Sequence, residues 1–240
     1  FELADKFASS NVAVYLFDMS GFGSSDGVPF NPTIEELIID LKSVLTQVRN
    51  KRPTFLYGHS LGAVVALTFL LLNPTCDIAG LMISSPIVSI PKEIKQNLIK
   101  SLFMRYISKF FDIYVASTMV NPTAITKNNF YVRQLLMSQN NTILGLKLAN
   151  DLLESFEFIK EEIHNFKFPL LVMHGTADIY CKAEESKWLA KSARSEHKRF
   201  VLLKEFCHEV YLERGERDVF REIKGFIFKV LPKLISKDRN

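Results

Sequence analysis

Residues 54–72 read TFLYGHSLGAVVALTFLLL, and this stretch decides the fold. Its first four residues form a short apolar run, residues 58–62 form the pattern Gly-x-Ser-x-Gly, and an apolar helical segment follows from residue 63. In a strand–turn–helix context this pattern is typical of a sharp turn that holds a serine hydroxyl above the carboxyl end of a parallel strand. We therefore predict that Ser60 is a nucleophile.

The neighbours of Ser60 have predicted roles of their own. Gly58 and Gly62 are expected to be glycines because side chains two residues on either side of so tight a turn would collide. His59 lies inside the turn, with its side chain aimed differently from that of Ser60. The backbone N–H of Leu61, at the start of the following helix, is the expected donor to a developing oxyanion.

The rest of the chain alternates strand and helix patterns. Solid apolar runs of four to six residues predict strands that are covered on both faces: 12–17, 54–57, 80–83, 170–173 and 200–203. Helical periodicity predicts helices over 33–48, 61–72, 183–191 and 216–230, the first with a capping box formed by Thr33 and Glu36. This alternation indicates an α/β fold with a mostly parallel sheet and helices on both faces.

A serine nucleophile needs a base, and the base needs an orienting carboxylate. The chain has five histidines: His59, His164, His174, His197 and His208. His208 follows the last predicted strand through a short loop, which is where a base should lie, whereas His174 is expected to structure its turn. Asp178 follows the strand just before the one that leads to His208, so the two loops should lie side by side. We therefore predict His208 as the base and Asp178 as the acid, and we expect Asp18 to form a turn.

Composition excludes several classes of protein. The chain has 240 residues, 48% of them hydrophobic and 23% charged, and a formal net charge of +4, a balance typical of one globular domain. Its basic residues are scattered, so nucleic acid is a poor candidate partner. The three cysteines, at positions 76, 181 and 207, fit a reducing compartment better than a disulfide framework or a zinc site, and we predict a cytoplasmic location with no metal. The sequence contains no apolar run long enough to span a bilayer.

Residues 87–165 break the alternation of strands and helices. The interval has helical periodicity and no convincing strand, and we predict that it is a helical cap inserted into a single domain covering residues 1–240. Within it, residues 98–115 predict a helix with a broad apolar stripe. Packing on the main body is the favoured role of this helix, and contact with a membrane surface is the alternative.

These motifs together resemble the monoacylglycerol lipase and serine aminopeptidase-like group of α/β-hydrolases. The resemblance is carried by the segment from Phe17-Asp18 to Gly21-Phe22-Gly23-Ser24-Ser25, by Gly58 to Gly62, by Ser84-Ser85-Pro86, by Phe168 to Asp178 and by Cys207-His208-Glu209. The chain order Ser60, Asp178, His208 is similar to the order found in that fold.

The resemblance implies a serine ester hydrolase that cleaves acyl-glycerol or related lipid esters through an acyl-enzyme, without a cofactor. Peripheral membrane contact through the cap and membership of a larger assembly stay open. Two alternatives also stay open: an amide- or peptide-cleaving serine hydrolase, and a hydrolase-like structural subunit. The family's first strands and its second oxyanion donor have no counterpart before Val12, so we expect the sequence to be the carboxyl-side part of a longer hydrolase. An intact sheet built from residues 1–240 alone would contradict this expectation.

Overall fold

A computed structural model describes residues 2–48, 52–89, 112, 114–116, 121–137, 143–213 and 216–237. Its centre is a four-stranded parallel sheet in the order β1-β2-β5-β6. The strands are β1 (Phe55–His59), β2 (Gly80–Ser84), β5 (Leu170–Gly175) and β6 (Lys198–Leu203). The sequence prediction of a parallel α/β sheet is confirmed, and each of these strands lies where an apolar run predicted one.

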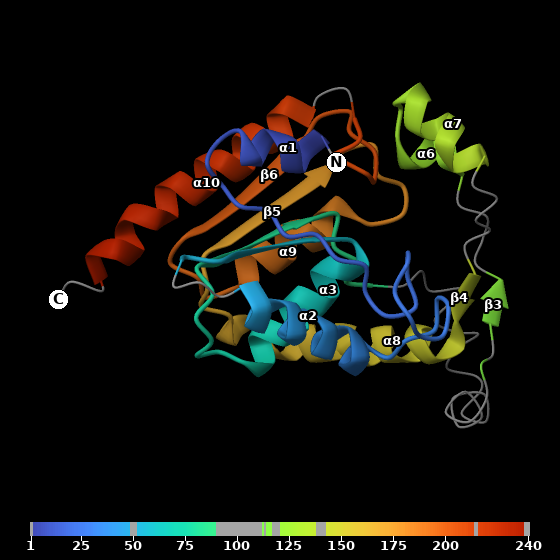
Figure 1. Cartoon of the computed structure of the whole chain (residues 1–240), viewed down its shortest axis with the longest axis horizontal. Helices are drawn as coiled ribbons and strands as arrows, with labels where there is room; N and C mark the ends of the chain where they lie inside the picture. Colours follow the sequence, from blue (N-terminus) through green and yellow to red (C-terminus); the bar gives the residue numbers. More distant parts are fainter. Residues whose placement is uncertain are drawn as a thin grey trace.

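Helices cover both faces of this sheet (Figure 1). One face packs against α2 (Ile34–Val48), α3 (Leu61–Leu72), α8 (Leu146–Glu162) and α9 (Ala183–Ser192). The other packs against α1 (Glu2–Ala8) and α10 (Glu216–Lys237). Alternate strand residues enter the two cores: Leu170 and Val172 pack on the α3 side, and Leu171 and Met173 on the α10 side. This explains why the strands read as unbroken apolar runs rather than as alternating patterns.

The predicted capping box of α2 is present. The Glu36 amide donates to Thr33 Oγ1 at 3.1 Å, and the Thr33 amide donates back to Glu36 Oε2 at 2.6 Å. Asp18 forms a turn as expected, because its Oδ2 accepts from the amide of Ser24 at 2.9 Å.

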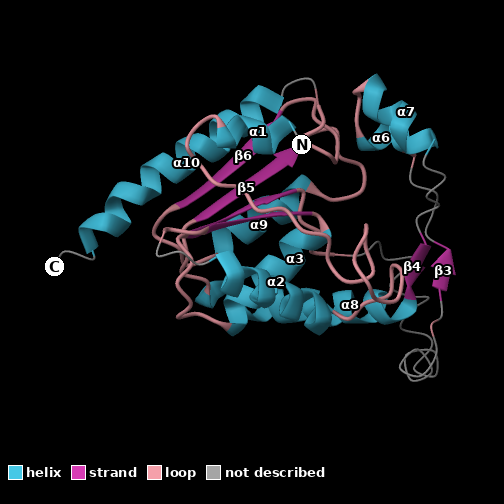
Figure 2. Cartoon of the chain, viewed as in Figure 1, coloured by secondary structure: helices cyan, strands magenta, loops and turns pink. Residues whose placement is uncertain are grey.

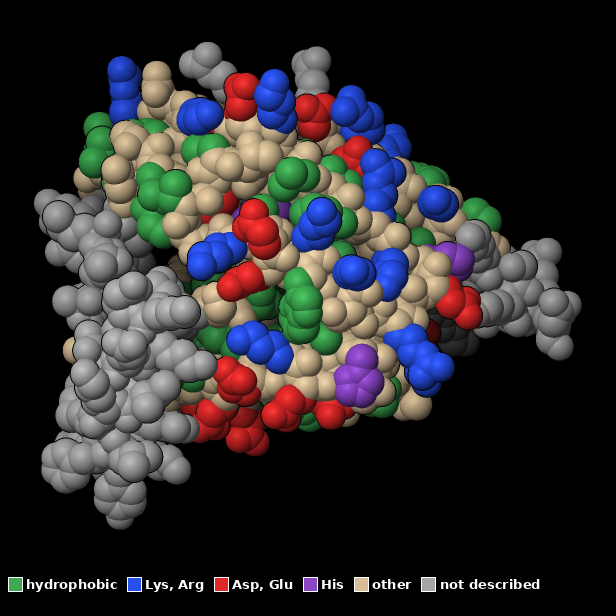
Figure 3. All heavy atoms as spheres, turned by 180° about the vertical axis from the view of Figure 1, so that it is seen from behind, with side chains coloured by type: hydrophobic (Ala, Val, Ile, Leu, Met, Phe, Trp, Pro, Cys, Tyr) green, Lys and Arg blue, Asp and Glu red, His purple; other side chains and the backbone are tan. Residues whose placement is uncertain are grey.

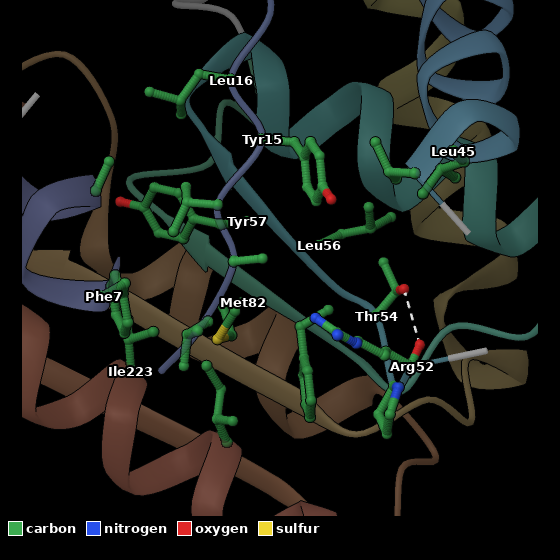
Figure 4. A pocket seen from close by; sticks show the side chains of 18 of the residues that line it. Phe7, Tyr15, Leu16, Leu45, Arg52, Thr54, Leu56, Tyr57, Met82 and Ile223 are labelled. Carbon is green, nitrogen blue, oxygen red and sulfur yellow. Dashed lines mark hydrogen bonds between the residues drawn. The ribbon is translucent and has the colours of Figure 1, made fainter. Parts of the chain in front are cut away.

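The segment 12–17, predicted as a strand, is not one: it belongs to no ladder among the described strands. A cavity of about 430 Å³ lies between this segment and β1, lined on one side by residues such as Tyr15 and Leu16 and on the other by Leu56 and Tyr57 (Figure 4). Backbone groups on the two sides of this cavity cannot form hydrogen bonds with one another, so the apolar run pairs with no described strand. Tyr15 and Leu16 are consequently 55% and 61% exposed.

Residues 87–165 differ from the prediction in their secondary structure (Figure 2). They include two three-residue strands, β3 (Tyr114–Ala116) and β4 (Ile143–Gly145), which pair antiparallel where no strand was expected. Among the described residues of this interval, the helices are α6 (Pro122–Ile125), α7 (Asn129–Met137), α8 and the short 3₁₀ helix η1 (Ile163–Asn165). Most of the predicted helix over 98–115 lies outside the described residues, and its last two positions belong to β3.

The helices of this interval occupy two different places. Apolar residues of α8 join the main core beside α2 and α3, whereas α6 and α7 lie off the carboxyl ends of the strands (Figure 1). That residues 87–165 form one cap stays a prediction.

Of the described helices, none is both long and apolar enough to cross a bilayer. On the face seen in Figure 3, Lys and Arg side chains are spread out with acidic side chains between them.

Candidate active site

The turn between β1 and α3 holds Ser60 in a strained conformation. Its φ is 51° and its ψ is −114°, in a region that residues with a side chain rarely adopt. The Ser60 amide donates to the Ser84 carbonyl at the end of β2 (3.0 Å), and the Ser60 carbonyl accepts from the Ala63 amide (3.1 Å). These bonds on both sides keep the strained residue in place.

The two glycines of this turn differ in what they require. A Cβ on Gly58 would lie 2.5 Å from the carbonyl oxygen of Gly62, so only glycine fits at position 58. A Cβ on Gly62 would have no heavy atom within 4 Å. The steric requirement predicted for both positions therefore holds for Gly58 and is wrong for Gly62, because the Gly62 α-carbon faces open space.

Asp178 and His208 reach Ser60 from the two neighbouring strands β5 and β6. Nε2 of His208 lies 3.1 Å from Oγ of Ser60, and Nδ1 of the same ring lies 2.9 Å from Oδ2 of Asp178. Asp178 lies in the loop after β5 and His208 in the loop after β6, and these strands pair along their whole length. The structure thus brings the three residues singled out in the sequence into one chain of hydrogen bonds.

The carboxyl group of Asp178 is fully buried, with 0% of its side chain exposed. Its Oδ1 accepts hydrogen bonds from the amides of Tyr180 (2.9 Å) and Cys181 (3.0 Å). Burial would raise the pKa of Asp178, but hydrogen bonds from His174 and His208 outweigh it and hold the pKa well below its usual range. Asp178 is therefore a carboxylate at neutral pH.

The loop that carries His208 is tied to β2 and to the region around α6. Ser85 Oγ donates to the His208 carbonyl at 2.9 Å, and the next amide, that of Glu209, donates to the Ile125 carbonyl at 3.0 Å. The buried Glu213 accepts from the amides of Lys127 (3.1 Å) and Cys207 (3.2 Å) through one carboxylate oxygen. Contacts with residues that are distant in the sequence thus fix the position of the loop that carries His208.

His59 points away from Ser60, as expected, into a polar cluster that the sequence analysis missed. Its Nδ1 lies 2.9 Å from Ser84 Oγ, which also contacts the Tyr57 hydroxyl at 2.7 Å, and its Nε2 lies 3.1 Å from Oε2 of Glu209. Burial would raise the pKa of Glu209, but the charge of His59 and a hydrogen bond from Tyr211 lower it from 4.5 to about 2. The only hint in the sequence was that Glu209 directly follows His208, whereas the pairing of Ser84 with His59 on the adjacent strand became visible only in the structure.

The other three histidines lie elsewhere in the fold. His197 precedes β6 at the amino end of the sheet, where its carbonyl accepts from the Leu170 amide at 2.8 Å. His164 is exposed in η1. His174 is completely buried and contacts Asp178 instead of a substrate-accessible surface.

Two groups of described residues bring atoms suited to a metal within 4.8 Å of one another. They are His59, His208 and Glu209, and Asp178, Cys181 and His208. Both include His208, whose two nitrogens already contact Ser60 and Asp178. A metal ion at either place would compete with those contacts.

Known proteins match this chain over nearly its whole length. A protein-family model described as "Serine aminopeptidase, S33" matches residues 1–215. An uncharacterized abhydrolase domain-containing protein of Dictyostelium discoideum is 27% identical over 92% of this chain, and a protein of Schizosaccharomyces pombe named a putative monoglyceride lipase is 24% identical over 89%. The chain spans 24% of the first relative and 58% of the second.

The fold is also that of a solved lipase structure. The crystal structure of the Paleococcus ferrophilus monoacylglycerol lipase superposes with a TM-score of 0.79 at 22% sequence identity, covering 94% of this chain and 87% of the lipase chain. The family match, which covers far more than half of the residues, and this shared fold agree with the resemblance drawn from the motifs. The chain belongs to the serine aminopeptidase S33 family and has the α/β-hydrolase fold.

Proposed function

We propose that this chain hydrolyses carboxylic esters with Ser60 as the nucleophile, His208 as the base and Asp178 as the orienting carboxylate. The observation that carries the proposal is the continuous chain of hydrogen bonds from Asp178 Oδ2 through both nitrogens of His208 to Ser60 Oγ. A nucleophile, a base and an orienting group in this geometry can perform acyl transfer.

The reaction has two halves. Oγ of Ser60 attacks the ester carbonyl carbon while its proton passes to Nε2 of His208, and the backbone N–H of Leu61 donates to the oxyanion that forms. Collapse of this intermediate breaks the ester C–O bond, and His208 returns the proton to the leaving alcohol. Water then attacks the acyl-enzyme with His208 again as base, which releases the carboxylic acid and restores Ser60.

The residues around Ser60 in the turn between β1 and α3 support this chemistry without reacting. Gly58 leaves room for the turn, Gly62 continues it into α3, and His59 connects the turn to Glu209 beside the base. Asp178, as a buried carboxylate, stabilises the imidazolium that His208 becomes during each half-reaction.

The proposed substrate is an acyl-glycerol or a related lipid ester. Support comes from relatives and solved structures that are named monoglyceride or monoacylglycerol lipases. The family description, serine aminopeptidase, keeps amide or peptide cleavage as the alternative activity.

The test is covalent labelling by a fluorophosphonate probe, followed by hydrolysis assays. We expect the folded protein to be labelled, Ser60→Ala to lose the label, and a control at the exposed Ser9, Ser9→Ala, to keep it. A monoacylglycerol should be hydrolysed faster than an aminoacyl anilide; the reverse order would favour the amide-cleaving alternative. Folded protein that takes up no label would refute the proposed enzyme and favour a structural subunit.

A further inference from the structure

His174 is a buried polar residue to which the proposed mechanism gives no task. It is the fifth residue of β5, with 0% of its surface exposed, and it lies between the carboxylate of Asp178 and helix α9. Its Nδ1 is 2.7 Å from Oγ of Ser186, which is also completely buried. Its Nε2 is 3.1 Å from the Cys181 carbonyl and 3.2 Å from Oδ2 of Asp178.

These contacts determine where the proton of His174 lies. Nε2 faces two oxygen atoms that can only accept, so this nitrogen carries the proton. Nδ1 faces a hydroxyl, and the Ser186 hydroxyl donates to it. Ser186 therefore fixes the orientation of the His174 ring, with the N–H of Nε2 shared between the Cys181 carbonyl and Oδ2 of Asp178.

Asp178 Oδ2 is consequently shared by two imidazole rings. His208 Nδ1 approaches it at 2.9 Å and His174 Nε2 at 3.2 Å, while Oδ1 accepts two backbone amides. Every side of the carboxylate is thus occupied by a donor, and the carboxylate cannot turn about its bond to Cβ without breaking a bond to a buried group.

We propose that His174 is a positioning residue for the reaction: its Nε2–H holds Oδ2 of Asp178 toward His208 and takes up part of the carboxylate's negative charge. For its kinetic consequences this inference rests on the proposed function. His174 contacts neither the nucleophile nor any surface that a substrate could reach, so it acts through Asp178 alone.

The direction of the effect follows from the shared oxygen. Removing the His174 donor leaves more negative charge facing His208, which stabilises the imidazolium and raises the pKa of His208. The acid limb of the kcat/KM profile, which requires neutral His208, then moves to higher pH. A less firmly held carboxylate also lowers kcat, while KM stays the same because His174 is remote from bound substrate.

Other groups that face His208 stay in place when position 174 changes. They are Glu209 in the same loop, His59 at the end of β1, with its ring centroid 4.9 Å away, and Tyr180 after β5, with its ring centroid 5.8 Å away. The thiols of Cys181 and Cys207 face Asp178 and also remain. A shift at His208 therefore reports on the contact between His174 and Asp178.

The first experiment uses the unaltered protein. Nitrogen-15 NMR of the imidazole rings identifies which nitrogen of His174 carries the proton, with no need for activity. The inference requires a proton on Nε2 of His174 at pH 7. A ring protonated on Nδ1 alone would overturn it.

The second experiment compares a variant that removes the hydrogen-bond donor at position 174 with a control variant at an exposed histidine. His174→Phe keeps a ring but loses the donor, and we expect the pKa of His208, followed by NMR, to rise and kcat to fall roughly tenfold with KM unchanged. His164→Phe makes the same substitution at an exposed histidine and should change neither quantity. A folded His174→Phe protein with the His208 pKa and kcat of the unaltered protein would overturn the inference.

A second pair of variants covers the case in which His174→Phe does not fold. The amide nitrogen of Gln reaches the position of Nε2, whereas that of Asn reaches only the position of Nδ1. His174→Gln should therefore keep the pKa of His208 and His174→Asn should raise it, and equal values in the two variants would contradict the inference. Because these pKa values come from NMR, they stay informative even if no ester proves to be a substrate, which separates this test from that of the proposed function.

Discussion

Gly58 and Gly62 occupy the two ends of one motif, yet their replacement by alanine should have opposite effects on stability. In Gly58→Ala the new methyl carbon would lie 2.5 Å from the Gly62 carbonyl oxygen, 2.7 Å from its carbon and 2.8 Å from Cα of Ala63. All three neighbours are backbone atoms at the start of α3, so no side chain can rotate away. Overpacking of this kind costs about 1–3 kcal/mol, and displacement of the strained Ser60 turn should place the loss at the upper end.

Gly62→Ala should stabilise the protein. Position 62 is the second residue of α3, and its φ is not positive, so alanine can adopt its backbone conformation. The added methyl group would meet open space. Alanine restricts the unfolded chain and favours the helix, which together contribute about 0.4–1 kcal/mol.

Thermal and urea unfolding, followed by circular dichroism, measure both effects on the same scale. For a chain of this length each kcal/mol corresponds to roughly 2–4 °C in Tm. Gly58→Ala should therefore melt several degrees below the unaltered protein and Gly62→Ala one to a few degrees above it. Equal losses at the two positions, or an unchanged Tm in Gly58→Ala, would refute the steric reasoning.

Three further predictions concern the histidine loop and the segment beside β1. Glu213→Ala leaves the buried amide of Cys207 and the part-buried amide of Lys127 without their acceptor, so it should cost about 1–3 kcal/mol in urea unfolding and lower kcat. An unchanged unfolding free energy would contradict this. Glu209, with its pKa lowered from 4.5 to about 2, stabilises the fold above pH 4.5 by up to about 3 kcal/mol, and this contribution is lost as the pH falls through that range. The difference in unfolding free energy between the unaltered protein and Glu209→Gln should therefore shrink between pH 6 and pH 3, and a constant difference would argue against the shift. Backbone amides of residues 13–17 should exchange with deuterium far faster than those of β5, unless the segment forms a ladder that the structure lacks.

Local patterns predicted the regular elements well because their causes are local. The apolar spacing and capping box of α2 and the solid apolar runs of β2 and β5 reflect burial and backbone capping within a few residues. The same argument failed at residues 12–17, because a strand also requires a partner at hydrogen-bonding distance, and a cavity lies where the partner would be. The strands β3 and β4 escaped prediction since three residues are too few to show a period.

The prediction that Ser60, Asp178 and His208 would meet rested on topology. Parallel strands end at one edge of a sheet, so residues just after neighbouring strands meet whatever the intervening sequence. The roles of Glu209, Ser84 and Ser186 had no such rule behind them. Each depends on which way a side chain turns from an adjacent strand or helix, and only the packed structure determines that direction.

The end of β2 shows how a strand without a predicted role can organise the candidate site. The Ser84 carbonyl accepts from the Ser60 amide, and the Ser84 hydroxyl contacts His59. The next residue, Ser85, is fully buried at a positive φ of 42°, donates its hydroxyl to the His208 carbonyl and donates its amide to the Met173 carbonyl of β5. Two consecutive serines thus tie together the turn with Ser60, the loop with His208 and the strand that leads to Asp178. Because these bonds are short and each joins β2 to a different element, the end of β2 helps to hold Ser60 and His208 at the 3.1 Å contact between them.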